Sequence, residues 1–367
     1  MKRVLHLLYE LKFSGAEVMY ADAAPLFQSL GCELGVVAVA PKFGEFAPVM
    51  EKAGYKTYHL PYPKGYISRF IWYRHLCQLI KRENYDVIHV HTSALRWGGA
   101  LCAWLTGCRC VSTFHSTFPT HWYSRPWHIW LRMTAKHIFK ARFQSIGDSV
   151  WNNEKTLFLN DTNLVYNWYG SNRFFPAANG EKERIRKQLG IREDALVVVS
   201  VAGCREMKRH CDIIRAVGKI DPKCPDILYL HVGSGDYEQH ERHLVEELGL
   251  ADHVMFCGAQ QEIRKYLIAS DIYLMTSRYE GVAITAIEAM ACKIPCILYD
   301  VAGLRDFNCE EQCSILIPED TDMLANKIIE LSNDEELKNR LSDKGEALVH
   351  RKYFMEHNVR QIYQMYQ

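Results

Sequence analysis

One stretch of the chain constrains its fold more than any other, because an apolar strand, a polar turn and an apolar helix follow one another without a break. The strand covers Ile272–Met275, the turn Thr276–Gly281 and the helix about 282–292. Glu288 is the only charged residue within this helix. A carboxylate is costly to bury among apolar side chains unless hydrogen bonds satisfy it. Glu288 is therefore a candidate ligand-binding residue.

The start of the same helix is a candidate anion site. It offers the free backbone N–H groups of Val282, Ala283 and Ile284, with the hydroxyl of Thr285 beside them. A helix N-terminus also carries the positive end of the helix dipole, which suits a phosphate or diphosphate. The alternative is an ordinary strand, turn and helix, in which Glu280 caps the helix and the second glutamate is solvated.

The spacing of the two glutamates resembles a known signature. Seven residues separate Glu280 from Glu288, Gly281 follows the first, and Ala-Met-Ala follows the second. This pattern resembles the nucleotide-sugar motif of retaining glycosyltransferases of family 4 (glycosyl transferases group 1). Members usually have Phe and then Pro or Gly after Glu-Gly, where this chain has Val282 and Ala283. The resemblance implies the GT-B fold, an α/β architecture of two Rossmann-like domains whose parallel sheets face each other across a cleft.

Apolar strands alternate with helices along the chain, and this rhythm is typical of parallel sheets that bind ligands at the carboxyl ends of their strands. We expect a first domain at 1–170, onto which a C-terminal helix at about 353–367 crosses back, and a second domain at 171–352. The last strand of the first domain is expected at 165–167. By the resemblance, the first domain binds the acceptor and the second binds the nucleotide-sugar.

The turn after the first strand reads Ser-Gly-Ala-Glu at 14–17, where family members commonly have Gly-Gly-x-Glu. A glycine at such a turn lets the backbone approach a ligand closely. The resemblance implies that Gly15 faces the donor and that Glu17 faces the acceptor. Helix capping alone would also explain this short motif.

His115 follows a strand that begins near Cys110, in the context Thr-Phe-His-Ser-Thr. The resemblance places His115 against the donor sugar as a catalytic residue, and Ser116 and Thr117 toward the acceptor. A lone histidine is more often a packed residue, so the position after the strand is what makes it a candidate. His89 and His91 alternate with apolar residues on one strand, and we expect them to be structural rather than metal-binding.

The strand at 195–201 ends in a basic turn that contains Arg205 and Lys208. The resemblance implies that Lys208 binds the donor diphosphate. Family members have an arginine about five residues before this lysine, where this chain has Gly203, and we expect Arg205 to replace it. Gly258 and Ala259 end a later strand, where relatives contact the nucleotide base.

These residues together imply a reaction. A sugar would pass from a nucleotide-diphosphate donor, expected to be a UDP-sugar, to an acceptor hydroxyl with retention of configuration, in the synthesis of a bacterial surface polysaccharide or glycolipid. Lys208 and the helix start would stabilise the leaving diphosphate. Glu288 would bind the ribose, Glu280 the sugar hydroxyls, and His115 would position the sugar. Because these groups could act without a metal, we expect neither a metal nor a cofactor.

Two other functions remain open at this point. A nucleotide-sugar 2-epimerase has the same two-domain fold, but it would need carboxylates in the first domain that the chain does not show. A noncatalytic sugar-nucleotide binding protein is the other alternative, and the presence of His115, Lys208, Glu280 and Glu288 argues against it. A dehydrogenase is disfavoured because Gly-x-Gly-x-x-Gly is absent after the first strand.

Charge is unevenly distributed, with a net charge of +8 for residues 1–170 and of −7 for the remainder. The stretch Phe118–Phe143 interleaves basic residues with tryptophans and has no acidic residue. Such a surface can contact an anionic membrane or a phosphorylated acceptor. The alternative is a helix whose aromatic side chains pack inward while its cations face water. No nucleic acid partner is expected.

The compartment is predicted from the N-terminus and the cysteines. Met-Lys-Arg leads directly into an apolar strand without a signal-peptide pattern, and no apolar run is long enough to span a bilayer. We expect a cytoplasmic protein that can associate peripherally with the inner face of the membrane. The 13 cysteines contain no Cys-x-x-Cys pair, so reduced thiols are expected rather than disulfides or a zinc site.

Overall fold

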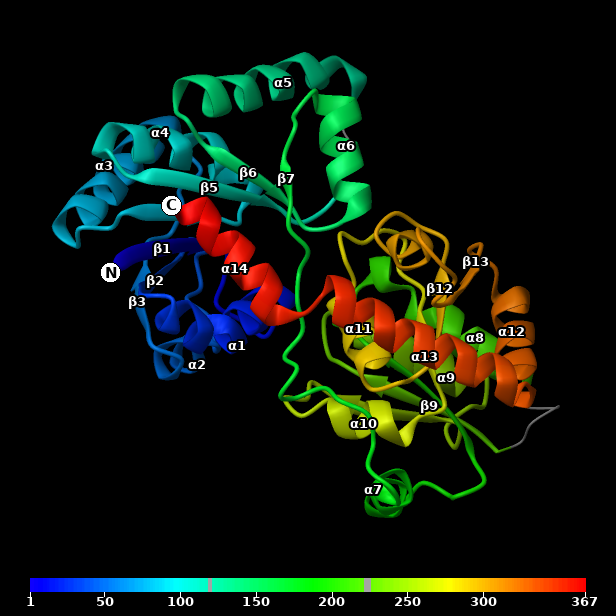
Figure 1. Cartoon of the computed structure of the whole chain (residues 1–367). Coiled ribbons are helices and arrows are strands. Elements are labelled where there is room, and N and C mark those ends of the chain that lie inside the picture. The colour runs from blue at the N-terminus through cyan, green and yellow to red at the C-terminus, as the bar shows by residue number, and fades with distance from the viewer. Residues whose placement is uncertain (118–120, 221–225) are drawn as a thin grey trace. The chain divides into compact units, whose positions relative to one another are not determined.

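The computed structural model describes residues 1–117, 121–220 and 226–367, and it contains two compact units (Figure 1). Unit 1 comprises Met1–Gly170 and Met355–Gln367, and unit 2 comprises Ser171–Phe354. Each unit contains one sheet whose strand pairs are all parallel, with helices between successive strands. The predicted α/β class with Rossmann-like parallel sheets is confirmed.

The sheet of unit 1 has seven strands in the order β3-β2-β1-β4-β5-β6-β7. Their bounds are β1 Lys2–Leu8, β2 Cys32–Ala38, β3 Tyr55–His59, β4 Val87–Val90, β5 Arg109–Phe114, β6 Arg142–Ser145 and β7 Asn163–Leu164. The strand expected at 165–167 was placed too late in the sequence, because the pairing of β7 with β6 ends at Leu164. The direction in which strands are added to the sheet reverses between β1 and β4. In α/β sheets, ligands bind at the carboxyl ends of the strands beside such a reversal.

The helices of unit 1 connect these strands. They are α1 Gly15–Ser29, α2 Ala47–Lys52, α3 Tyr66–Arg82, α4 Arg96–Thr106, α5 Arg125–Met133, α6 Asp148–Phe158 and α14 Met355–Tyr366, with one-turn segments η1 Ser93–Leu95, η2 Trp122–Ser124 and η3 Thr134–Ile138. The last helix, α14, packs on α1 and β5. Its buried Tyr366 hydroxyl lies 2.7 Å from His89 Nδ1, so the C-terminal segment completes the core of unit 1.

The sheet of unit 2 has six strands in the order β10-β9-β8-β11-β12-β13. Their bounds are β8 Leu196–Val201, β9 Ile227–Val232, β10 Val254–Gly258, β11 Ile272–Met275, β12 Cys296–Tyr299 and β13 Ile315–Ile317. Strands β8, β10 and β11 match the strands named in the sequence analysis; β13 was missed because three residues are too few to show a period. Strand order reverses between β8 and β11, so this unit also has a switch point.

The helices of unit 2 cover this sheet and form a core with it. They are α7 Glu181–Leu189, α8 His210–Ile220, α9 Glu238–Glu247, α10 Arg264–Ala269, α11 Ile284–Ala291, α12 Thr321–Asn333 and α13 Glu335–Lys352, with one-turn segments η4 Glu206–Lys208 and η5 Arg305–Asn308. Among the described residues, no helix combines the length and the apolar character needed to cross a bilayer.

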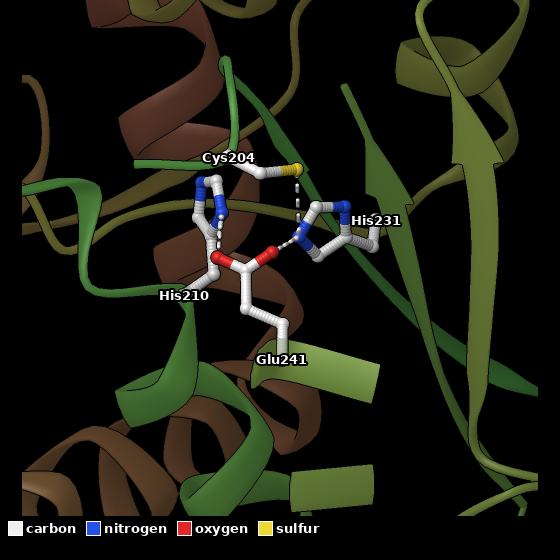
Figure 2. Close-up of side chains that lie close together, drawn as sticks. All are labelled: Cys204, His210, His231 and Glu241. Carbon is white, nitrogen blue, oxygen red and sulfur yellow. Dashed lines mark hydrogen bonds and ion pairs between the residues drawn. The ribbon is translucent and has the colours of Figure 1, made fainter. Parts of the chain in front are cut away.

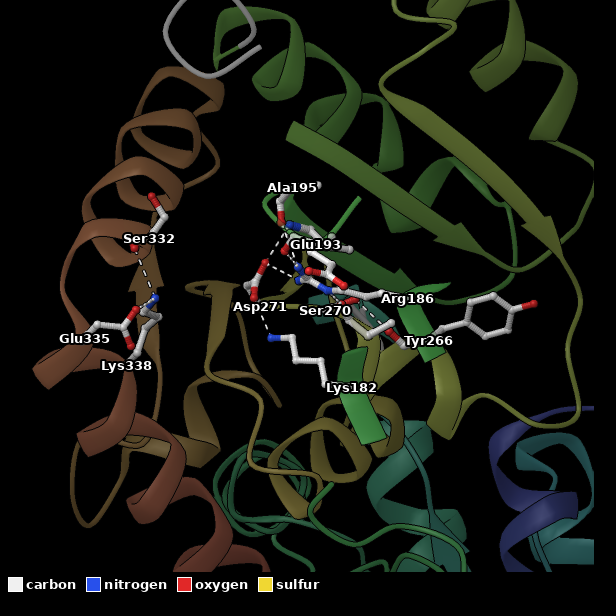
Figure 3. A network of polar contacts seen from close by, with 12 residues as sticks. Lys182, Arg186, Glu193, Ala195, Tyr266, Ser270, Asp271, Ser332, Glu335 and Lys338 are labelled. Atoms are coloured by element: carbon white, nitrogen blue, oxygen red, sulfur yellow. Dashed lines mark hydrogen bonds and ion pairs between the residues drawn. The ribbon is translucent and has the colours of Figure 1, made fainter. Parts of the chain in front are cut away.

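Helix α7 is attached to the sheet by one buried arginine (Figure 3). The Arg186 guanidinium donates to the carbonyl oxygens of Ala269, Glu193 and Ala195 and to Asp271 Oδ2, over distances of 2.8 to 3.1 Å. Lys182 also pairs with Asp271. Although burial opposes it, these two cations lower the pKa of Asp271. The network therefore stabilises the fold above the ordinary aspartate pKa of about 3.9, and this contribution is lost as the pH falls through the lower folded-state value.

We predict that Arg186→Met lowers the free energy of unfolding by about 3–5 kcal/mol, because it removes four hydrogen bonds of a buried guanidinium and one of the two cations that pair with Asp271. Arg184→Met on the exposed face of the same helix is the matched control, with an expected change within about 0.5 kcal/mol. Urea unfolding followed by circular dichroism measures both. Equal midpoints for the two variants would show that α7 does not depend on Arg186.

Candidate functional site

In unit 2 the candidate residues gather at the carboxyl ends of β8 and β11, the two strands on either side of the switch point. A small crevice there is lined by the ends of both strands and by the first residues that follow them. Its polar lining residues are Ser200, Lys208, His210, Thr276 and Ser277. The position is the one that the parallel sheet offers to a ligand.

The turn that carries Lys208 is fixed by the end of β11. Thr276 Oγ1 lies 3.0 Å from the carbonyl oxygens of both Lys208 and Arg209, and the Arg278 N–H donates to Met207 O over 2.9 Å. Lys208 itself forms an ion pair with Glu280. Thr276 was missed by sequence reasoning, although a polar residue directly after an apolar strand is the available signal.

The Glu280 turn rests against the loop after β12. Gly303 has φ +85°, and a Cβ added there would lie 2.6 Å from the carbonyl oxygens of both Glu280 and Gly281. The Glu280 N–H also donates to Ala302 O over 3.4 Å. Only a glycine allows this close approach, so Gly303 sets the position of the Glu280 side chain.

Helix α11 begins two residues later than predicted, at Ile284, with Ala283 in extended conformation as its N-cap. Val282 is buried in the preceding loop, so its N–H is not part of the first turn. The hydroxyl of Thr285 also differs from expectation, because it lies 2.7 Å from the Tyr273 hydroxyl. The N–H groups at the helix start are therefore those of Ala283, Ile284 and Thr285, which bond to no acceptor within the described ranges.

The remaining donor-site candidates of unit 2 differ in their exposure. Glu288 is 6% exposed on α11, as expected for a carboxylate that faces the protein interior. Arg205 is exposed and its side chain forms no hydrogen bond or ion pair in the described part of the chain. Gly258 has φ +65° at the end of β10, and Ala259 is exposed beside it. Strand β9 lies between β10 and β8, so these two residues belong to the outer part of the site.

The Gly-Ser-Gly segment after β9 has a packing role. A Cβ on Gly233 would lie 1.8 Å from Ala202 O, and one on Gly235 would lie 2.4 Å from Cys204 O. The Cys204 N–H donates to Ser234 O over 3.0 Å. Two loops at the open end of the sheet therefore touch backbone to backbone, and this contact requires both glycines.

In unit 1, His115 ends a chain of hydrogen-bonded imidazoles. His115 Nε2 lies 3.1 Å from His91 Nδ1, and His91 Nε2 lies 3.0 Å from His6 Nδ1. Burial, assisted by the charge of Arg96, lowers the pKa of His115 to about 4, and burial lowers that of His6 to about 3. The rings are neutral at pH 7, so His115 can offer a ligand a hydrogen bond but no charge. His91 was expected to have only a structural role, but its ring lies within hydrogen-bond distance of the candidate residue His115.

The other candidates of unit 1 lie at two loops. Gly15 is exposed at the first position of α1, and Glu17 is buried with its carboxylate accepting a hydrogen bond from the Ser14 hydroxyl. This contact joins two side chains at the start of the helix, and Ser14 as N-cap makes no side-chain hydrogen bond to the helix backbone, so helix capping does not explain the motif. Ser116 and Thr117 are partly exposed in the loop after β5. The switch point of unit 1 lies between β1 and β4, and these loops follow β1 and the neighbour of β4.

The basic and aromatic stretch differs from the alternative in which its aromatic side chains pack inward and its cations face water. Four of its aromatic side chains are exposed, namely Trp122 at 80%, Tyr123 at 66%, Trp127 at 58% and Trp130 at 47%, whereas Phe143 at its end is buried. Several cations instead have intramolecular partners. Arg132 pairs with Glu154, Lys136 donates to Asp161 O, and Arg142 donates to Met365 O. Phe118, where the stretch begins, lies outside the described residues.

We predict that Gly303→Ala weakens binding of a nucleotide diphosphate at least about tenfold, or about 1.4 kcal/mol, because the added methyl group displaces the Glu280 turn. Gly249→Ala is the control, since Gly249 has φ +69° with no atom within 4 Å of the added Cβ. Both changes strain a left-handed residue, and only one adds a clash. Isothermal titration calorimetry measures the affinities, and equal affinities for both variants would contradict the role of Gly303.

Comparisons with known proteins agree with this geometry. Residues 181–348 match the family profile described as Glycosyl transferases group 1, and residues 13–145 match that of Glycosyltransferase Family 4. The chain is 26% identical over 306 residues to N-acetyl-alpha-D-glucosaminyl L-malate synthase of Bacillus anthracis, covering 79% of this chain and 77% of that protein. It is 25% identical over 275 residues to UDP-Gal:alpha-D-GlcNAc-diphosphoundecaprenol alpha-1,3-galactosyltransferase of Escherichia coli, covering 71% and 70%.

A solved structure shows the same fold. Anabaena HepE, in complex with UDP and glucose, superposes with a TM-score of 0.82 at 20% identity, covering 99% of both chains. The two profile matches together span most of the chain, and each coincides with one of the two units. The protein is therefore a glycosyltransferase of the GT-B fold that belongs to family 4, the glycosyl transferases group 1.

Proposed function

We propose that the protein transfers a sugar from a UDP-sugar to a hydroxyl of a saccharide or lipid-linked saccharide, with retention of configuration, in the synthesis of a bacterial surface polysaccharide or glycolipid. The observation that carries this proposal is the meeting of Lys208, Glu280 and the start of α11 at the switch point of unit 2. The galactosyltransferase named above has a UDP-linked donor and a diphosphoundecaprenol-linked acceptor in its name, and HepE was solved with UDP.

The proposed donor site provides positive charge where the reaction develops negative charge. The leaving diphosphate becomes more negative in the transition state, and preoriented donors stabilise it. Lys208 and the N–H groups of Ala283, Ile284 and Thr285 would serve this purpose, with the unpaired Arg205 in reach of an outer phosphate. These groups come from the protein itself, so the proposal includes neither a metal nor a cofactor in the reaction.

Glu280 has two roles in this proposal. In the free protein it pairs with Lys208 and thereby holds the ammonium group at the mouth of the crevice. When the donor binds, the lysine turns to the diphosphate and the carboxylate accepts hydrogen bonds from the sugar hydroxyls. Glu288, buried on α11, would bind the ribose hydroxyls, and Gly258 with Ala259 would contact the base.

Unit 1 would hold the acceptor. The neutral His115 would position the donor sugar by a hydrogen bond, with Gly15 facing the donor and Glu17, Ser116 and Thr117 facing the acceptor. The acceptor hydroxyl would attack from the face that the diphosphate leaves. In this mechanism the departing diphosphate can take the hydroxyl proton, so no side chain is assigned as general base.

We predict that UDP, and not GDP or ADP, raises the melting temperature of the protein. Binding stabilises a folded protein by mass action, by about 2.7 kcal/mol at a hundredfold excess over the dissociation constant. Lys208→Ala and Glu288→Ala should lose this response. Lys187→Ala, an exposed lysine of α7, is the control and should retain it. A larger shift with another nucleotide would contradict the UDP assignment, and no shift with any nucleotide would contradict the donor site.

We also propose that the protein acts at the cytoplasmic face of a membrane and that the aromatic side chains of η2 and α5 enter the interface. Trp127 and Trp130 stack with ring centroids 4.8 Å apart, and both are exposed beside Trp122. Tryptophan is suited to the headgroup region because its ring is apolar and its N–H is polar. Since several of the nearby cations are paired within the fold, insertion of the rings would contribute more than charge.

We predict that the wild type floats with liposomes containing anionic lipid and that Trp122→Ala/Trp127→Ala reduces the partition coefficient at least about tenfold, because each ring removed from water contributes roughly 1.5–3 kcal/mol. Leu248→Ala removes an apolar side chain that is 43% exposed in unit 2 and should have no effect. Absence of wild-type flotation would contradict membrane contact, and flotation that the double variant retains would place the contact elsewhere.

A further inference from the structure

Four side chains that commonly bind metal ions meet inside unit 2 (Figure 2). Cys204 lies in the loop after β8, His210 is the first residue of α8, His231 lies on β9 and Glu241 lies on α9. Their exposed fractions are between 0 and 2%. They are far apart in the sequence and form no Cys-x-x-Cys or similar motif, which is why sequence spacing predicted no metal site.

The ligand atoms of these residues point toward one another (Figure 2). His210 Nδ1 lies 3.0 Å from Glu241 Oε1, His231 Nε2 lies 3.0 Å from Glu241 Oε2, and Cys204 Sγ lies 3.9 Å from His231 Nε2. All four ligand atoms lie within 4.8 Å of one another. Zinc ligands stand about 2.0–2.3 Å from the ion in a tetrahedron, which separates them by roughly 3.3–3.8 Å. Small side-chain movements would bring the cluster to that geometry.

The charge of the cluster also favours a cation. Glu241 is fully buried, and its carboxylate lies beside the two imidazoles and the Cys204 thiol, with no lysine or arginine paired to it among the described residues. Burying an anion without a compensating charge is costly. A divalent ion with one thiolate, one carboxylate and two neutral imidazoles would form a site without net charge. This mixture of one sulfur, two nitrogen ligands and one oxygen suits Zn²⁺.

The buried histidines of unit 1 provide a contrast. His6, His89 and His91 also lie close together, but they offer no anionic ligand. Both ring nitrogens of His89 have hydrogen-bond partners, the Tyr366 hydroxyl and Thr113 Oγ1, each at 2.7 Å. His89 therefore has no ring nitrogen left for an ion, and this second cluster does not offer a complete metal site.

We propose that Cys204, His210, His231 and Glu241 bind one structural Zn²⁺. The protein fills all four positions, which is the character of a structural rather than a catalytic site. Binding releases the thiol proton of Cys204 to solvent and leaves the thiolate on the ion. The ion would join the loop after β8 to α8, β9 and α9, and it would thereby fix both ends of the turn that carries Arg205 and Lys208.

The first test measures metal in the full chain, produced without a histidine tag. After incubation with zinc and dialysis against metal-free buffer, mass spectrometry of the digested protein should give about one zinc per chain. Cys204→Ser and Glu241→Gln should retain less than a tenth of that amount. Cys211→Ser is the matched control, because Cys211 is also buried and adjoins His210 but lies outside the cluster, and it should bind as the wild type does.

The second measurement does not depend on the folding of a variant. Cobalt added to the metal-free wild type should give the intense visible bands of a tetrahedral site and a thiolate-to-cobalt charge-transfer band, and a chelator should lower the melting temperature of the zinc-loaded protein by several degrees. A wild type that retains no more zinc than Glu241→Gln, or that gives no charge-transfer band, would overturn the proposal. Nucleotide binding is measured in a separate experiment, so the result of the zinc measurements does not decide whether the proposed donor site is correct.

Discussion

The contact between the end of β11 and the turn after β8 is the constraint on which the proposed donor site depends. Strands β8 and β11 are neighbours although β9 and β10 intervene in sequence, so the first loop of unit 2 lies beside the Glu280 turn. Thr276 bonds the backbone of that first loop, and Gly303 supports the Glu280 turn from its other side. Both charged side chains of the proposed site are thus placed by backbone contacts, which do not depend on the ion pair between Lys208 and Glu280.

The candidate residues of the two units differ in charge and in burial. In unit 2 the charged pair of Lys208 and Glu280 remains partly exposed, so a phosphate can compete for the lysine without the cost of uncovering a buried ion. In unit 1 the imidazoles are buried and neutral, and each neutral ring can donate only one hydrogen bond. The tautomer of His115 is therefore linked to those of His91 and His6. A glycosyltransferase needs both properties, charge at the leaving group and defined geometry at the sugar.

Most of the strands and the polar ends that follow them could be predicted from the sequence, because a buried parallel strand is an apolar run and its polar end is a local feature. The position of α11 was less predictable. Val282 is apolar, like the residues of the helix that follows it. However, the loop after β12 packs on Glu280 and Gly281 and keeps the chain extended through Ala283. Exposure of Trp122 and Trp127 was also undetermined, because the same spacing of aromatic residues fits an inward or an outward face.

The sequence by itself determined the α/β class, the two-glutamate motif and the identity of Lys208 and His115 as candidates, since all of these depend on local composition and on the order of residues. Only the tertiary structure decided which strand ends meet, because the neighbour of a parallel strand is set by crossover connections and by packing of the whole sheet. For this reason Thr276, Gly303 and His91 became visible only as contacts. The same holds for the cluster of Cys204, His210, His231 and Glu241, whose four elements come together through folding alone.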